Sequence, residues 1–304
     1  MTQPKAVIWT GALYAFVSYF IWGITPIFWK QLTHFHPKAM LGYRVAWSCL
    51  ILLILGLFVR RDVRRGLVDL TRFRNMGLVF AATGLIGINW YTYIWAVSHS
   101  RIVEASLGYY LNPLGNIAIG VLFFKERLSP VRWAAFGLAL VAVGILIVGY
   151  GSLPWISLLL ASSFAVYGMV KKLLSMSAAF TLGVETLLLL PLALVLVHGA
   201  YPGWTFITDL RAWEHSLFFC SGIITLIPLF AFGKAAQLMP YSTLGFFQYI
   251  APTLQLFCAV VLYDEPFDST RLIAFACIWV SLAAISYETL VRLPRQRART
   301  PDLS

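Results

Sequence analysis

The chain has 304 residues, of which 60% are hydrophobic and 12% are charged, and its mean hydropathy is +0.80. This composition excludes a soluble globular protein, because too few polar residues remain to cover its surface. The net charge of +11 does not indicate nucleic-acid binding, since the Lys and Arg residues lie between apolar runs of membrane-spanning length. We therefore expect a membrane protein whose basic loops face the cytoplasm.

The apolar runs predict an all-α protein, because a helix that crosses the hydrocarbon layer needs roughly 20 mainly apolar residues. The sequence contains ten such runs. They are 7–29, 39–59, 76–97, 103–124, 131–150, 154–170, 179–197, 215–232, 242–263 and 271–288. Five lie in residues 1–150 and five in residues 151–290, and a basic tail follows at 291–304, so we predict two five-helix repeats.

The two halves share an internal duplication. Residues 98–142 match residues 237–281 with a constant offset of 139, which pairs Pro113 with Pro252. A repeat of this length, centred on two apolar spans, indicates a duplicated membrane unit.

The charges at the ends of the duplicated segments differ in sign. Glu126 has basic neighbours, whereas Glu265 has mainly acidic ones. Because basic segments stay in the cytoplasm, the two copies are expected to cross the membrane in opposite directions. With both termini inside, most of the 23 Lys and Arg residues fall on the cytoplasmic side. Inverted repeats of this kind are typical of secondary transporters, which bind substrate near the bilayer midplane.

Polar residues recur on one face of the fourth and the ninth predicted helix. Amides within a span need partners, so these faces predict either a substrate cavity or interhelical hydrogen bonds. Pro113 and Pro252 also free backbone carbonyls for a ligand. The candidate cavity residues here are Tyr109, Asn112, Asn116, Gln248, Tyr249 and Gln255.

Further candidates lie on the first, third and sixth predicted helices. Asn89 and Tyr93 are separated by one helical turn, while Trp22 and Tyr167 each precede a glycine. Together they predict an aromatic-walled cavity with few charges. The alternative for each aromatic residue is ordinary packing or a place in the interfacial aromatic belt.

Two ionisable residues, Arg44 and Glu185, lie well inside predicted spans, where such residues are candidates for function. Counted from the helix starts, each lies ~8–9 Å deep from opposite faces, so they are not expected to pair with each other. Arg44 is expected to meet Glu104 at the outer mouth, and Glu185 to meet Lys171 or Lys172 at the inner one. Such pairs serve either as gates or as structural ion pairs.

Motifs for other chemistries are absent from the sequence. There is no G-x-x-x-x-G-K-[ST], no H-E-x-x-H and no G-x-S-x-G, so neither ATP hydrolysis nor a known hydrolase is indicated. The four cysteines share no short spacing, and the five histidines fall in predicted outer loops or at helix ends. We expect no cofactor, no metal and no enzymatic activity.

Four stretches resemble the RarD branch of the EamA-type permeases, which belong to the drug/metabolite transporter superfamily. They are VEASLGY at 103–109, NP at 112–113, VETL at 184–187 and STLGFFQY at 242–249. The resemblance implies ten transmembrane helices in two inverted repeats, a bacterial inner-membrane location and a cavity lined by helices 1, 3, 4, 6, 8 and 9. The branch carries a name linked to chloramphenicol sensitivity. Relatives often have His-Arg where this chain has Tyr43-Arg44.

The sequence thus predicts a permease that moves a small metabolite or drug-like compound by alternating access, coupled to protons or to exchange. The expected partners are that compound and the lipid bilayer. The alternative is a membrane scaffold that binds a partner protein without transport. An intramembrane enzyme would need a nucleophile or a metal site, which the sequence does not indicate.

Overall fold

The computed structural model describes residues 5–57, 60–125, 128–174, 176–201, 210–238 and 247–297. These residues form helices joined by short connections. The helices are α1 Lys5–Lys30, α2 Pro37–Gly56, α3 Arg60–Leu70, α4 Phe73–Ser98, α5 Ile102–Phe124, α6 Pro130–Tyr150, α7 Trp155–Leu173, α8 Ala178–Ala200, α10 Ala212–Leu238, α12 Ile250–Phe257, the π-helical turn η2 Cys258–Leu262, and α13 Ser269–Arg297. The predicted all-α class is confirmed.

Eight of these helices are long and apolar enough to cross a membrane. They are α1, α2, α4, α6, α7, α8, α10 and α13. Helix α5 is 23 residues long and carries the polar residues Asn112 and Asn116 and the helix-interior Pro113. The ninth predicted span is described only from residue 247 onward, and its apolar helix there runs from Ile250 to Leu262.

Residues 60–75, which lie between the second and third predicted spans, were expected to form a polar loop but are mostly helical. They contain the helix α3, which packs against α4 and α8. A Cβ atom placed on Gly66 would lie 2.5 Å from the ring of Phe180, so only glycine permits this close contact. Val63, Leu67 and Leu70 have the spacing of an apolar helix face, but the many Arg residues around them make the segment look like a polar loop in the sequence.

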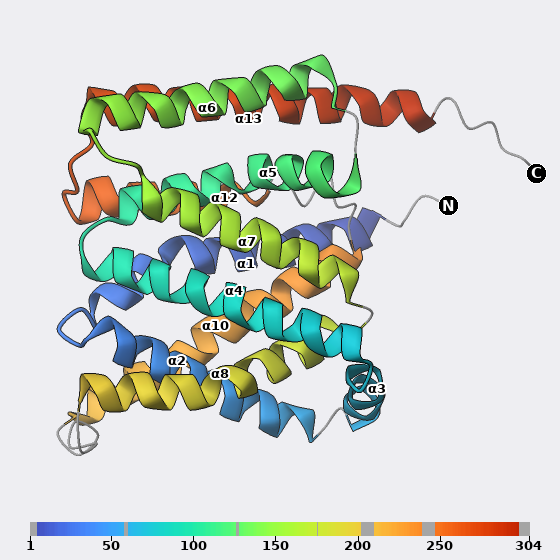
Figure 1. Ribbon diagram of the computed structural model, residues 1–304, viewed down its shortest axis with the longest axis vertical. Coiled ribbons are helices and arrows are strands. Elements are labelled where there is room, and N and C mark those ends of the chain that lie inside the picture. The colour runs from blue at the N-terminus through green and yellow to red at the C-terminus, as the bar shows by residue number, and fades with distance from the viewer. Residues whose placement is uncertain are drawn as a thin grey trace, which may run out of the picture.

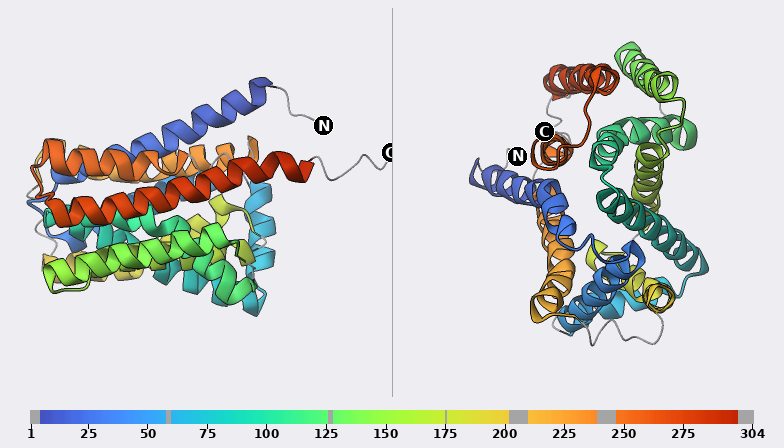
Figure 2. Two further views of the ribbon diagram at one scale, coloured as in Figure 1. Left: turned by 90° about the horizontal axis from the view of Figure 1, so that it is seen from above. Right: turned by 90° about the vertical axis from the view of Figure 1, so that its left-hand side faces the viewer.

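The long helices run side by side, and α3 lies across one end of them (Figure 1). The same end carries the start of α1 and the end of α13, and we call it the basic end. The opposite end, here the distal end, carries the short connections from α1 to α2, from α4 to α5 and from α6 to α7. Seen from the distal end, α1, α10 and α12 form one row that faces a second row of α4, α5 and α7 (Figure 2, right).

The most extensive packing joins helices from different halves of the chain. Helix α1 packs on α10, α2 on α8, α4 on α7, α5 on α7 and on α12, and α6 on α13. The α6–α13 pair stands apart from the two rows (Figure 2, right). Small residues permit the close approaches, as at Gly108, where an added Cβ would lie 2.9 Å from the carbonyl oxygen of Ser157.

At the distal end, Glu265 fixes the beginning of α5. Its two carboxylate oxygens accept hydrogen bonds of 2.9 and 2.8 Å from the backbone N–H groups of Ile102 and Val103. A carboxylate at a helix N-terminus satisfies free N–H groups and interacts favourably with the helix dipole. Asp264 adopts a left-handed backbone conformation with φ 49°, which turns the chain so that Glu265 points inward. Its counterpart Glu126 lies outside the described residues.

Candidate functional site

Arg44 is buried near the distal end of the bundle, about 10 Å along α2 from its first residue. Only 8% of the residue is exposed. Its guanidinium carbon lies 4.2 Å from the centre of the Trp90 ring on α4 and 5.5 Å from that of Trp29 on α1. Three helices thus enclose one cation between aromatic faces.

The guanidinium group has no acidic partner among the described residues. No ion pair or hydrogen bond links Arg44 to them, and its Nε atom is buried without an acceptor. The expected pair with Glu104 is wrong. Glu104 instead accepts two hydrogen bonds, of 2.6 and 2.8 Å, from Arg101. Arg101 immediately precedes α5 and is only three residues from Glu104, so these two residues form a local ion pair in the first turn of the helix.

Burying the charge of Arg44 has an energetic cost, which its aromatic contacts reduce. Removing a guanidinium from water costs several kcal/mol even after structural relaxation. The cation–π contacts with Trp90 and Trp29 return about 2 kcal/mol each when they are desolvated. They offset the cost of the charge, but they leave the Nε donor of Arg44 buried without an acceptor in the described structure.

Two tyrosines lie within electrostatic range of this cation. Tyr93 on α4 and Tyr109 on α5 interact with Arg44 electrostatically, and their ring centres are 5.8 Å apart. The Tyr93 hydroxyl also forms a 2.7 Å hydrogen bond with Thr25 Oγ1 on α1. Two of the predicted cavity residues therefore meet at one site, which we call the Arg44 cluster: Thr25, Trp29, Arg44, Trp90, Tyr93 and Tyr109.

Deeper in the bundle, Trp22 and Gln255 join α1 to α12. Pro26 has no backbone N–H, so the carbonyl of Trp22 lacks its usual partner within the helix. Gln255 Nε2 donates a 3.1 Å hydrogen bond to this carbonyl, and Thr25 Oγ1 donates another of 2.7 Å. The other end of the Gln255 amide, Oε1, is buried without a partner in the described structure.

Asn112 has a similar unpaired group. It is 3% exposed, and its Oδ1 atom has no hydrogen-bond partner in the described part of the chain. It lies one helical turn from Tyr109 on the same face of α5. Buried polar atoms are nearly always paired, so an unpaired amide beside the Arg44 cluster indicates a place for a ligand or water.

Three other predicted cavity residues have different surroundings. Asn89 donates 3.0 Å hydrogen bonds to the Leu160 carbonyl and to Ser163 Oγ, both on α7, which fits the alternative of interhelical hydrogen bonding. Asn116 is exposed and Gln248 is half-buried. In the described structure, the side chains of Asn89, Asn116 and Gln248 form no hydrogen bond with a residue of the Arg44 cluster.

At the basic end, Glu185 lies fully buried on α8 with two partners. Lys171 Nζ on α7 donates a 2.7 Å hydrogen bond to Glu185 Oε1, and the hydroxyl of Tyr167 donates one of 3.0 Å to Oε2. Lys171 also contacts Thr181 Oγ1. The predicted pairing with Lys171 is confirmed, and it adds the candidate cavity residue Tyr167 to the same cluster.

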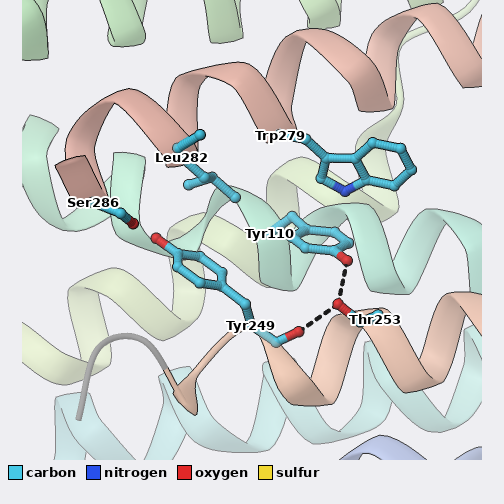
Figure 3. Close-up of a pocket in the computed structure, with 7 residues that line it drawn as sticks. Tyr110, Tyr249, Thr253, Trp279, Leu282 and Ser286 are labelled. Atoms are coloured by element: carbon cyan, nitrogen blue, oxygen red, sulfur yellow. Dashed lines mark hydrogen bonds between the residues drawn. The ribbon is translucent and has the colours of Figure 1, made fainter. Parts of the chain in front are cut away.

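Tyr249 lines a separate pocket of about 340 Å³ at the surface of the bundle, between α5, α12 and α13 (Figure 3). Tyr110 and Tyr249 lie below Trp279, Leu282 and Ser286 of α13 (Figure 3). The Tyr110 hydroxyl forms a 2.6 Å hydrogen bond with Thr253 Oγ1. The lining is mainly apolar, as expected where a helix bundle faces lipid tails.

Three residues of the Arg44 cluster were not predicted from the sequence. Trp90, Trp29 and Thr25 were not candidates, because an aromatic residue or a threonine in a span usually serves packing. Trp90 follows Asn89 directly and precedes Tyr93 by three residues, so the helical period could have shown that it shares a face with Tyr93. Within the described residues, no group of His, Cys, Asp or Glu side chains is placed to hold a metal ion.

Comparison with known proteins identifies the family of the chain. The model of the EamA-like transporter family matches residues 9–150. The protein RarD of Streptomyces exfoliatus is 42% identical over 95% of this chain and 92% of its own length. The chain is a RarD-type member of the EamA family. It is therefore a multi-pass membrane protein of a transporter family.

Other relatives extend over similar lengths. An uncharacterized transporter of Pseudomonas aeruginosa is 42% identical, over 94% of this chain and 97% of its own. RarD of Escherichia coli is 38% identical, over 90% and 92%. A solved crystal structure matches this EamA-family fold with a TM-score of 0.59 over 95% of this chain, and its 18% identity supports the fold alone.

We predict that Lys171→Met destabilises the protein because it leaves the fully buried Glu185 carboxylate without its cation. Breaking one side of a buried ion pair costs about 3–5 kcal/mol. Chemical unfolding in detergent should show this loss, and Lys171→Met combined with Glu185→Gln should recover most of it. Lys172→Met, on the exposed neighbour, is the control and should change little. A double variant no more stable than Lys171→Met would contradict the role of the ion pair.

Proposed function

We propose that this protein is a secondary transporter that moves a small metabolite or drug-like compound across the bacterial inner membrane by alternating access. The observation that carries this proposal is the correspondence between the helices of the two halves. Adding 139 to the bounds of α4, 73–98, gives 212–237, and α10 spans Ala212–Leu238. The same shift takes α6, 130–150, to 269–289, where α13 begins at Ser269.

The packing partners support the same correspondence. The shift relates α1 to α7, α2 to α8, α4 to α10, and α5 to α12 with η2. The contact of α1 with α10 then corresponds to that of α7 with α4, and the contact of α1 with α12 to that of α7 with α5. Two five-helix repeats related by an inverted twofold, ten spans in all, account for this pattern.

The two buried charge clusters suit alternating access. The Arg44 cluster lies toward the distal end, and the Glu185 ion pair lies toward the basic end. An inward-opening step would separate Lys171 on α7 from Glu185 on α8. The carboxylate would then lose its cation in a low-dielectric setting and take up a proton. Proton uptake and opening of the basic end would thereby be linked.

The orientation follows from the positive-inside rule. We place the basic end with both termini in the cytoplasm and the distal end in the periplasm. Reporter fusions at Arg65 and at Tyr201 measure this directly. Arg65 should report the cytoplasm and Tyr201 the periplasm, because α3 and the α8 C-terminus lie at opposite ends. A periplasmic reporter signal at Arg65 would disprove the inverted arrangement.

A transporter must admit water to its midplane, whereas a scaffold need not. We therefore expect Asn112→Cys and Gln248→Cys to react with a membrane-impermeant thiol reagent in a cysteine-free background, and added substrate to slow the reaction. Val148→Cys, on the lipid-facing α6 and 86% exposed, is the control and should not respond to substrate. Uptake of a metabolite library into liposomes tests transport itself. Unreactive cysteines together with no uptake would favour the scaffold.

The role of Glu185 in coupling makes a further prediction. Glu185→Gln keeps the hydrogen-bonding shape but cannot exchange a proton. We expect it to abolish accumulation driven by a pH gradient in liposomes while substrate binding persists. Thr186→Val, on the adjacent residue, is the control. Full gradient-driven accumulation by Glu185→Gln would show that Glu185 is structural.

A further inference from the structure

The structure assigns Arg44 as the binding group for a single carboxylate on the transported compound, with an aromatic or branched apolar body held by the neighbouring tyrosines. This assignment rests on the proposed function as a transporter. It specifies the substrate class as a small amphipathic organic acid.

The argument begins with charge. Arg44 is 92% buried, as its 8% exposure shows, and no acid among the described residues balances it. Two acids near the distal end already have partners. Glu104 forms an ion pair with Arg101, and Glu265 accepts hydrogen bonds from the N-terminus of α5. No described carboxylate supplies the negative charge that is missing beside Arg44, and we assign that charge to the ligand. Arginine binds carboxylates through a planar pair of N–H donors, and its Nε donor is unused here.

The size of the missing charge selects a carboxylate. One guanidinium carries a single positive charge, and the buried cation described at the basic end, Lys171, is already neutralised by Glu185. A phosphate group with nearly two negative charges would leave a buried excess of negative charge at the Arg44 cluster. A monocarboxylate restores neutrality.

The surroundings describe the rest of the ligand. The rings of Trp90 and Trp29 lie against the guanidinium, so the ligand would approach from a side that these rings leave open. Tyr93 and Tyr109 offer ring surfaces from two helices that belong to the facing row in Figure 2, and α1 of the other row supplies Thr25. Ser48, one turn further along the same face of α2, and Asn112 on α5 add buried polar atoms without partners in the described chain. An apolar body with one or two polar groups complements this set.

The test compares carboxylates with their primary amides, which have nearly the same shape but no charge. The probes are 3-phenylpropionate, indole-3-acetate and 3-methylbutanoate, each beside its amide, and phenethylamine as the cation. Calorimetry on the purified full chain in nanodiscs should detect binding of at least one acid. Its amide should bind at least about 30-fold more weakly, the loss expected when a buried charge pair lacks one partner.

Variants of Arg44 separate binding from structure. Arg44→Met should remove acid binding and raise the thermal unfolding midpoint of the ligand-free protein, because it removes a buried unpaired charge. Arg44→Lys should bind the acid more weakly than the parent. Arg271→Met is the matched control: Arg271 also lies over an aromatic ring, 5.4 Å from the centre of Tyr150, but it is only half-buried and lies at the distal end, outside the Arg44 cluster. It should leave acid binding unchanged.

Three outcomes would overturn the assignment. They are equal binding of an acid and its amide, no binding by any carboxylate, and a lower midpoint for ligand-free Arg44→Met with acid binding retained. Liposome uptake of neutral or cationic compounds under any of these outcomes would leave the proposed transport function intact. Absence of all uptake, together with unreactive cysteines at positions 112 and 248, would reject transport itself.

Discussion

The low dielectric inside a membrane-embedded bundle penalises every charge and every backbone group that lacks a partner, and this constraint shapes the interior of the protein. Glu185 meets it with two hydrogen-bond donors, and Glu265 meets it by binding two N–H groups at the start of α5. Arg44 does not meet it through any described carboxylate. The residues most relevant to function are therefore those whose partners are incomplete, because a ligand can complete them.

A proline within a helix leaves a backbone carbonyl without its N–H donor, and a side chain from another helix can supply the missing hydrogen bond. Pro26 leaves the Trp22 carbonyl without an N–H donor, and Gln255 supplies one from α12. Pro228 lies in α10, where its own carbonyl accepts a 2.7 Å hydrogen bond from Ser18 of α1. Gln255 thus satisfies the carbonyl that Pro26 frees in α1, and Ser18 links α1 to α10 at Pro228. Some of the polar side chains that the sequence assigns to substrate binding therefore form hydrogen bonds between helices, while others remain candidates for the cavity.

The sequence was sufficient for the fold class because membrane spans follow from length and hydropathy alone, and the expected bounds of α6 and α8 differ from the structure by three residues or fewer. The pairing of Glu185 with Lys171 could also be predicted, since depth along adjacent helices brings them together. The pairing of Arg44 with Glu104 failed because Arg101 lies closer in sequence, and depth arguments do not rank competing partners. The aromatic enclosure by Trp90 and Trp29 depends on how three helices rotate about their axes, which periodicity does not determine.

The packing between the halves has a consequence for how the bundle can move. Every extensive interface joins a helix before residue 151 to one after it, while neighbouring helices within either half touch far less. The halves are therefore interleaved and cannot rock against each other as two separate bodies. In any large motion, helices from both halves of the chain must move together, such as α1 with α10 in one group and α4 with α7 in the other. Neither half of the chain would keep its buried faces covered alone, so the described helices form one interleaved bundle.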